Sequence, residues 1–175
     1  MANRAIEWAR RERAATAALA IFVIAVATLG GAWYFEIVLE MPPCHLCLEE
    51  RIPYHVIIPL SLLLAIAALV RAPRWLIAVG FVVILAAALY DAALSTYHAG
   101  VEWRWWPGPT DCTGPVTDFT KKGSLLDQLK SVHIIPCDVA AWRLFGLSLA
   151  GYNALISLAL AAIAVFGLVP RKRAR

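Results

Sequence analysis

Four long apolar runs constrain this chain more than any other feature of its sequence. They cover about residues 14–35, 48–70, 75–97 and 144–169. Each is long enough to cross the roughly 30 Å of bilayer hydrocarbon as a helix, which takes about 20 apolar residues. A segment that crosses lipid must satisfy its own backbone hydrogen bonds, so helices are expected in all four places. The sequence therefore predicts an all-α polytopic membrane protein, a four-helix transmembrane bundle forming one domain over residues 1–175.

The composition agrees with a protein whose solvent is lipid. Hydrophobic residues make up 61% of the 175 residues and charged residues only 16%, more apolar surface than a soluble domain of this size needs. The net charge of +4 would also suit a nucleic-acid-binding protein. The basic residues, however, gather just outside the apolar runs, where they set membrane orientation. We therefore expect the lipid bilayer, and no nucleic acid, as a partner.

The positions of the 16 lysines and arginines predict which side each loop faces. Ten of them lie before the first run, between the second and third runs, or in the tail at 170–175. These ten are Arg4, Arg10, Arg11, Arg13, Arg71, Arg74, Arg171, Lys172, Arg173 and Arg175. Cytoplasmic loops carry the excess of Lys and Arg, so both termini and the 71–74 turn are expected to be cytoplasmic. A short loop at 36–47 and a long loop at 98–142 then lie on the outer face.

The four cysteines all fall in these two outer loops, where disulfides can form and persist. Cys44 and Cys47 form a Cys-x-x-Cys motif before the second run, and Cys112 and Cys137 lie in the long loop. A thiol at the start of a helix is stabilised as thiolate by unpaired backbone N–H groups and the helix dipole. Arg51 follows Cys47 by one helical turn and can lie on the same side. The pattern predicts redox chemistry.

The cysteines also admit structural interpretations. A disulfide within the Cys-x-x-Cys motif closes so short a loop that it adds little stability through chain entropy. A metal site would need His45 or His55 beside the two thiolates, and the sequence has no second such motif to complete the four ligands of most structural zinc sites; we expect no metal. Cys112 and Cys137 have 24 residues between them, which suits a structural staple. They could equally be a second exchange pair that passes two electrons through mixed disulfides.

Several features together resemble the DsbB family of bacterial membrane enzymes. These are the four apolar runs, the Cys-x-x-Cys motif followed by Arg51, the Trp-Pro-Gly-Pro and cysteine segment at 106–112, and the segment at 136–147. Members of that family reoxidise the periplasmic thiol oxidase DsbA and pass the electrons to quinone. The resemblance implies the bacterial inner membrane with the cysteines on the periplasmic face, ubiquinone or menaquinone as cofactor, and a DsbA-like partner. Relatives called DsbI, which oxidise a dedicated partner, are equally compatible.

The resemblance also implies a role for each cysteine. Cys112 would form the mixed disulfide with the soluble oxidase, and Cys137 would carry the exchange to Cys44. Cys47 would face the quinone as thiolate, with Arg51 polarising a quinone oxygen. The expected enzyme is a dithiol:quinone oxidoreductase. One alternative is an outward-directed reductase similar to vitamin K epoxide reductase, although its active motif follows the loop cysteines; another is a non-enzymatic scaffold with two structural disulfides.

Polar residues interrupt the outer end of the third apolar run. Asp91, Ser95, His98 and Glu102 recur at spacings of four, three and four, which places them on one face of a helix. An ionisable residue inside a membrane helix is costly and usually functional. Because quinone reduction consumes two protons, Asp91 and His98 are candidate quinone-binding residues that deliver protons or position the ring. Alternatively, Asp91 only accepts a hydrogen bond from a neighbour such as Ser95.

Overall fold

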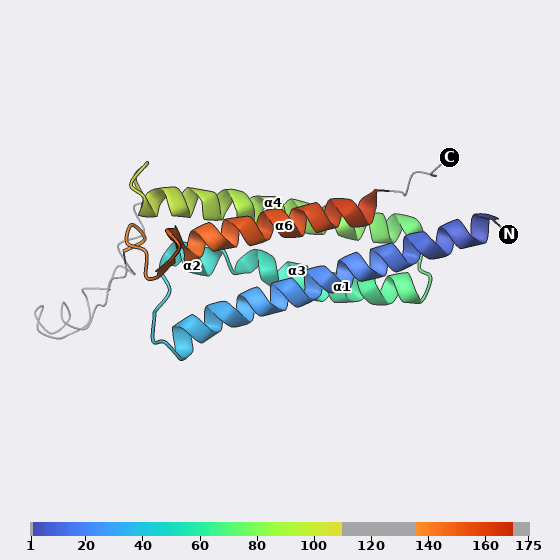
Figure 1. The fold of residues 1–175 in the computed structure, drawn as a ribbon, viewed down its shortest axis with the longest axis horizontal. Helices are drawn as coiled ribbons and strands as arrows, with labels where there is room; N and C mark the ends of the chain where they lie inside the picture. Colours follow the sequence, from blue (N-terminus) through green and yellow to red (C-terminus); the bar gives the residue numbers. More distant parts are fainter. Residues whose placement is uncertain (1, 110–135, 170–175) are drawn as a thin grey trace, which may run out of the picture.

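The computed structural model describes residues 2–109 and 136–169, and its main feature is four long helices that run side by side (Figure 1). They are α1 (Ala2–Ile37), α3 (Ile52–Leu69), α4 (Arg74–Glu102) and α6 (Leu149–Leu168). Each belongs to a segment long and apolar enough to cross a membrane. The structure thus confirms the predicted all-α, four-helix membrane fold.

A one-turn helix and a small hairpin lie at one end of the bundle. Helix α2 (His45–Glu49) precedes α3, and strand β1 (Arg143–Leu144) pairs antiparallel with β2 (Leu147–Ser148). The second apolar run is therefore two helices, with a break at residues 50–51. Pro53 lies in the first turn of α3, where its missing N–H costs no hydrogen bond. The break separates the short helix that carries the cysteine motif from the long helix α3.

The fourth membrane helix begins at Leu149 and not at the predicted residue 144. Phe145 (φ 50°) and Gly146 (φ 85°) both have the left-handed conformation that a tight two-residue hairpin turn requires. Ser148 then caps the helix, since its hydroxyl oxygen accepts a hydrogen bond from the Gly151 N–H at 3.2 Å. Hydrophobicity alone could not show this turn, because its residues are as apolar as the helix that follows.

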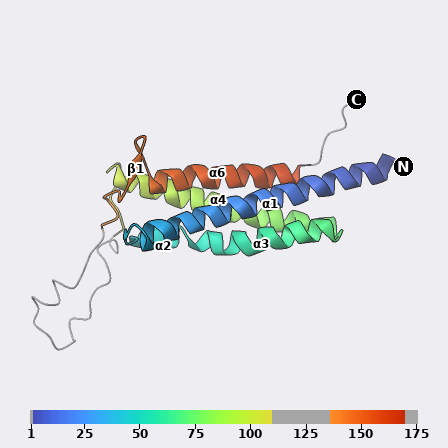
Figure 2. The ribbon, with the colours of Figure 1, turned by 60° about the horizontal axis from the view of Figure 1, so that its bottom comes forward.

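The helices pack mainly as two pairs, α1 along α3 and α4 along α6, with further contacts between the pairs. The core between them is made of aliphatic side chains with Tyr54 and Phe81, and Phe81 is fully buried with Ile21 and Ile84. The start of α1, the α3–α4 connection and the end of α6 lie at one end of the bundle (Figures 1 and 2). The cysteine motif and the hairpin lie at the opposite end. The α3–α4 connection, which carries Arg71, and the start of α4 at Arg74 are thus separated from the Cys-x-x-Cys motif by the full length of the bundle.

Candidate redox site

The Cys-x-x-Cys motif forms the start of α2. Cys44 is the N-cap residue, and its Sγ accepts a hydrogen bond from the Cys47 backbone N–H at 3.3 Å. A hydrogen bond also joins the two thiol groups, with 2.9 Å between the two Sγ atoms. Both cysteines are free, so the pair is in its reduced state. Two thiols held this close on one helical turn are placed to form a disulfide through side-chain rotation.

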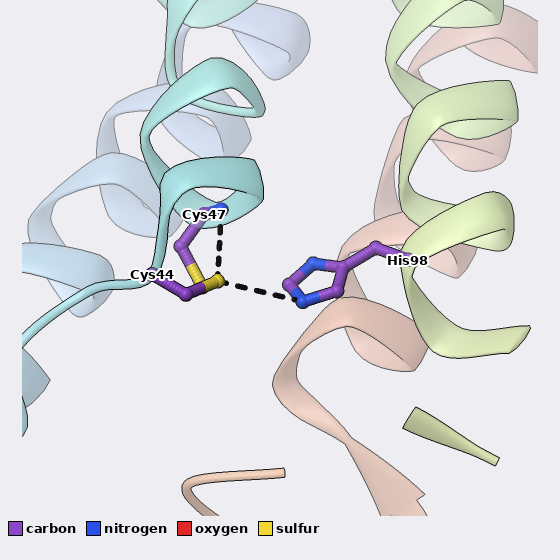
Figure 3. Close-up of side chains that lie close together, drawn as sticks. All are labelled: Cys44, Cys47 and His98. Atoms are coloured by element: carbon purple, nitrogen blue, oxygen red, sulfur yellow. Dashed lines mark hydrogen bonds between the residues drawn. The ribbon is translucent and has the colours of Figure 1, made fainter. Parts of the chain in front are cut away.

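His98, which comes from α4, adds a third functional group to the pair (Figure 3). Its Nε2 lies 3.6 Å from Cys44 Sγ, and its Nδ1 lies 2.7 Å from Glu50 Oε1. His98 is 2% exposed and Glu50 7% exposed, so the whole series is shielded from solvent. The carboxylate fixes the ring so that Nε2 faces the sulfur. A thiol, an imidazole and a carboxylate in this order form an arrangement that activates a thiol as a nucleophile.

These contacts lower the pKa of Cys44 from its usual 9.0 to about 4. The hydrogen bond from the Cys47 thiol has the largest effect, and the hydrogen bond and charge of His98 add to it, while burial acts in the opposite direction. Cys44 is therefore a thiolate at neutral pH. The family resemblance gave thiolate character to Cys47. In this reduced state Cys47 is the proton donor to Cys44, and its role toward a quinone stays a prediction.

One loop cysteine lies beside the motif. Cys137 is disulfide-bonded and 2% exposed, and it belongs to a small buried cluster with Cys44 and Leu46. The other loop cysteine, Cys112, falls outside the described residues. Exchange between two cysteine pairs requires that a thiolate reach a disulfide sulfur. Cys137 packs in one cluster with both cysteines of the motif, and the exchange between Cys137 and Cys44 that the family resemblance implies stays a prediction.

Arg51 follows the motif and forms a salt bridge with Glu36 at the end of α1, with 2.5 Å between Nη1 and Oε2. The arginine side chain is 15% exposed and borders the cavity described next. The adjacent Glu50 turns the other way, toward His98. The neighbouring residues Glu50 and Arg51, at the break between α2 and α3, thus contact different partners. Each has a partner of the kind that a buried charged group requires.

A cavity of about 190 Å³ opens beside the motif, between α1, the α2–α3 segment and α6. Cys47, Arg51, Tyr54 and His98 supply its reactive and polar groups, and Phe35 belongs to its mainly apolar wall. A largely apolar cavity with a few convergent polar groups is typical of a site for a small hydrophobic ligand. Of the predicted quinone-binding residues, Cys47, Arg51 and His98 therefore line one cavity.

Asp91, the fourth predicted quinone-binding residue, is fully buried behind that cavity and does not line it. Its Oδ2 accepts hydrogen bonds from Ser157 Oγ at 2.5 Å and from Asn153 Nδ2 at 3.2 Å, both on α6. The Tyr54 hydroxyl lies 3.3 Å from Ser157 Oγ and donates to Asn153 Oδ1 at 2.6 Å. A chain of hydroxyl groups therefore joins Asp91, through Ser157, to Tyr54 in the cavity wall.

The predicted polar face of the third membrane helix is confirmed, because all four of its residues are buried. Sequence analysis missed the residues that meet this face. Asn153 and Ser157 are polar and four apart in the last apolar run, a pattern that could have marked them. Glu50 gave no such signal, because it adjoins Glu49 in sequence and only the fold shows that Glu50 is buried while Glu49 is not.

Comparison with known proteins gives a consistent result. A family model described as "Disulfide bond formation protein DsbB" matches residues 13–167. The chain is also 27% identical to the uncharacterized protein RP370 of Rickettsia prowazekii (strain Madrid E) over 162 residues, which cover 90% of each chain. No solved structure matches the chain. The family match includes every residue of the site described above.

Proposed function

Because the chain belongs to the DsbB family of disulfide bond formation proteins, we propose that it is a thiol oxidase that passes electrons from a periplasmic dithiol to membrane quinone. The family and the four membrane-spanning helices make it a multi-pass membrane protein of disulfide chemistry. The proposal adds that quinone is the electron acceptor. It rests chiefly on one observation, the apolar cavity in which Cys47 meets Arg51.

The cavity offers what a quinone headgroup needs. The ring is flat and apolar, and its two carbonyl oxygens need hydrogen-bond donors. The Arg51 guanidinium can donate to one oxygen and stabilise the negative charge that develops there as electrons arrive from Cys47. A lipid-soluble acceptor also explains why the thiol pair lies at the end of a membrane bundle and not in a soluble domain. Ubiquinone and menaquinone both fit this description.

The electrons would come from a soluble DsbA-like oxidase. Its dithiol would reduce the Cys112–Cys137 pair, which would then reduce the Cys44–Cys47 pair. A strong oxidant releases its electrons only to a stronger one, and each 30 mV of mismatch is worth about 1.4 kcal/mol for a two-electron couple. The quinone pool supplies that driving force. The basic α3–α4 connection lies at the opposite end of the bundle from α2 and its cysteine motif, which supports a periplasmic position for the site in a bacterial inner membrane.

The residues of the site account for both protons that quinone takes up. The Cys44 thiolate and the Cys47 thiol become a disulfide, which yields two electrons and the Cys47 proton. His98, hydrogen-bonded to Cys44, holds the proton that Cys44 gave up and supplies the second one. Asp91 reaches the cavity through the hydroxyls of Ser157 and Tyr54. It can pass a proton to the quinone oxygen that His98 does not reach and then take up the proton that Cys47 releases, so that two protons are transferred in total.

The test is quinone reduction by the purified protein, with a reduced DsbA-like oxidase as donor and a short-chain quinone as acceptor. The wild-type protein should consume quinone, and replacing any one cysteine with serine should stop turnover at a different mixed-disulfide stage. His45→Gln is the matched control, because His45 lies in the motif with a half-exposed side chain. Full activity of Cys47→Ser would refute the proposed route.

The two alternatives predict different results. An outward-directed reductase would reduce the oxidised partner when supplied with quinol, and it would not consume quinone. A scaffold with structural disulfides would keep its cysteines oxidised in cells, whether or not respiratory quinone is depleted. Trapping free thiols in growing cells distinguishes the scaffold from the oxidase. Comparing a general DsbA with a dedicated oxidase as donor distinguishes a DsbB-like role from a DsbI-like one.

A further inference from the structure

Three side chains that commonly bind metal ions converge at the motif. The donor atoms of Cys44, Cys47 and His98 all lie within 4.8 Å of one another (Figure 3). The sequence offered only His45 and His55 as histidines near the two cysteines. The fold supplies a different one, 54 residues after Cys44 and on another helix. Two thiols and an imidazole form a donor set that suits a thiophilic divalent cation such as Zn²⁺.

The imidazole is oriented as in many metal sites. Its Nδ1 is hydrogen-bonded to Glu50 at 2.7 Å, which leaves Nε2 directed at the Cys44 sulfur. A carboxylate on the far nitrogen fixes the ring and raises the basicity of the nitrogen that binds the metal. Glu50 and His98 are both almost fully buried, so this orientation is held by the fold.

Glu102 is a candidate for the fourth ligand. It follows His98 by one helical turn, and its Oε1 lies 4.0 Å from His98 Nε2. It is 8% exposed, and its Oε2 has no hydrogen-bond partner within the described part of the chain. A buried polar atom without a partner costs free energy and calls for an explanation. Glu102 is not among the donors that lie within 4.8 Å of one another, so its side chain would have to rotate toward a bound cation, which would then satisfy this oxygen.

The spacing needs only a small adjustment. With Zn–S bonds of about 2.3 Å and Zn–N bonds of about 2.0–2.1 Å, tetrahedral ligand atoms stand roughly 3.3 to 3.8 Å apart. The 3.6 Å between Cys44 Sγ and His98 Nε2 already fits. The two sulfurs are 2.9 Å apart and must separate by about 0.9 Å. A rotation of the Cys47 side chain can provide this movement.

We propose that the reduced Cys44–Cys47 pair and His98 form a binding site for a thiophilic divalent cation, and that the bound ion blocks the thiol chemistry of the motif. Both sulfurs donate electron pairs to the ion, so neither can attack a disulfide or a quinone. The protons of Cys47 and His98 leave as the ion binds. The metal-free pair is oxidised to a disulfide when quinone takes up its two electrons, and the disulfide has no thiolate left to bind the ion. Metal binding stands independently, whereas the inhibition rests on the proposed oxidase function.

The test uses Co²⁺, a spectroscopic substitute for Zn²⁺, added without oxygen to the purified, reduced, full-length protein. We expect one ion per chain, thiolate-to-cobalt charge-transfer bands, and displacement by Zn²⁺. The same protein with its cysteines oxidised should show no bands. His98→Gln should weaken binding at least tenfold and Glu50→Gln about 10- to 100-fold. His45→Gln and His55→Gln are the matched controls and should bind as the wild type does.

Two further measurements make the result decisive. A Cys112→Ser/Cys137→Ser double variant should keep the bands, which assigns them to the motif, and the helical circular dichroism of His98→Gln should show that it is folded. Absent bands, bands that need the loop cysteines, or equal affinity in folded His98→Gln would overturn the metal site. Zn²⁺ that binds without slowing quinone reduction would overturn only the inhibition. Wild-type protein without turnover in metal-free buffer would count against the oxidase and leave the metal result standing.

Discussion

Replacing His98 with glutamine tests the electrostatics of the redox site most directly. The imidazole lies 3.6 Å from the Cys44 sulfur and contributes a hydrogen bond and a positive charge that help to hold the pKa of Cys44 at about 4. Glutamine keeps a side chain of similar reach and removes the charge. The hydrogen bond from Cys47, which has the largest effect on Cys44, remains. The pKa of Cys44 should therefore rise without returning to 9.0.

The expected size of the change follows from the geometry. An opposite charge within about 4–6 Å shifts a pKa by roughly one to three units, so a pKa near 6 is expected in His98→Gln. At pH 5 the thiolate fraction of Cys44 would fall about tenfold, whereas at pH 8 both proteins would be almost fully ionised. Two units correspond to about 2.7 kcal/mol. Because this stabilisation of the reduced state is lost, the reduction potential of the Cys44–Cys47 pair should fall by about 60 mV at pH 7.

The assay is the pH dependence of Cys44 alkylation in the reduced protein, followed by mass spectrometry of the labelled peptide. The midpoint of the profile gives the pKa. The plateau rate is a poor readout, because a thiolate of lower pKa is also a weaker nucleophile. His45→Gln, which changes a more exposed histidine of the same motif, should leave the midpoint unchanged. If His98→Gln and the wild type share one midpoint, His98 does not stabilise the thiolate and the argument fails.

The sign of the linked stability change is also fixed. A thiol whose pKa is lower in the folded state adds stability above its unfolded pKa and loses it as the pH falls through the folded one. The unfolding free energy of the reduced protein should therefore decrease as the pH falls from about 9 toward 4. This decrease should be smaller in His98→Gln. Thermal unfolding of the reduced and oxidised proteins measures this difference, because the oxidised pair has no thiolate to lose.

The remaining predictions concern the cavity, the hydroxyl chain and the hairpin. Arg51→Gln should slow quinone reduction by about 100- to 1,000-fold, as the loss of a charged donor at a developing oxyanion does. Single-turnover exchange with the oxidase should be unaffected, and a uniform loss of both steps would contradict the assigned role. Asp91→Asn and Ser157→Ala should each reduce turnover and alter its pH profile while the protein stays folded; unchanged profiles would remove Asp91 from proton delivery. Gly146→Ala should cost about 1–2 kcal/mol in unfolding free energy because of its positive φ. Gly30 is a helical position with open space around it, so Gly30→Ala should leave the unfolding free energy unchanged or increase it.

The fold was predictable because lipid imposes a simple rule on sequence. Long apolar runs can only be helices in a bilayer, so their number and approximate ends could be read directly. The hairpin at 143–148 could not, because its turn depends on the positive φ of Phe145 and Gly146, and Phe145 is an unusual residue for that conformation. An apolar turn at a membrane surface has the same hydrophobicity as the first turn of a helix.

The site divides in the same way between local and long-range information. The Cys-x-x-Cys motif and the polar face of α4 follow from short spacings, which are properties of a single helix. The contact between Cys44 and His98 joins residues 54 apart, and that between Glu50 and Asn153 joins residues 103 apart. Such contacts depend on how helices pack against one another. Sequence spacing therefore marked the candidate residues of the site but not the long-range contacts between them.

The charges of the site explain how electron and proton transfer can be coupled inside a membrane protein. In the proposed mechanism His98 donates one hydrogen bond to the Cys44 thiolate and one to the Glu50 carboxylate, so both ring nitrogens carry a proton and the ring is an imidazolium. The reduced site then holds the negative charges of Cys44 and Glu50 and the positive charge of His98. Oxidation removes the charge of Cys44, and transfer of the His98 proton to quinone removes the charge of the ring. The net charge of the three groups is the same before and after. A buried site of low dielectric penalises any step that changes its net charge, so the two transfers are favoured together, and a His98 variant should slow electron transfer even where the Cys44 thiolate is fully formed.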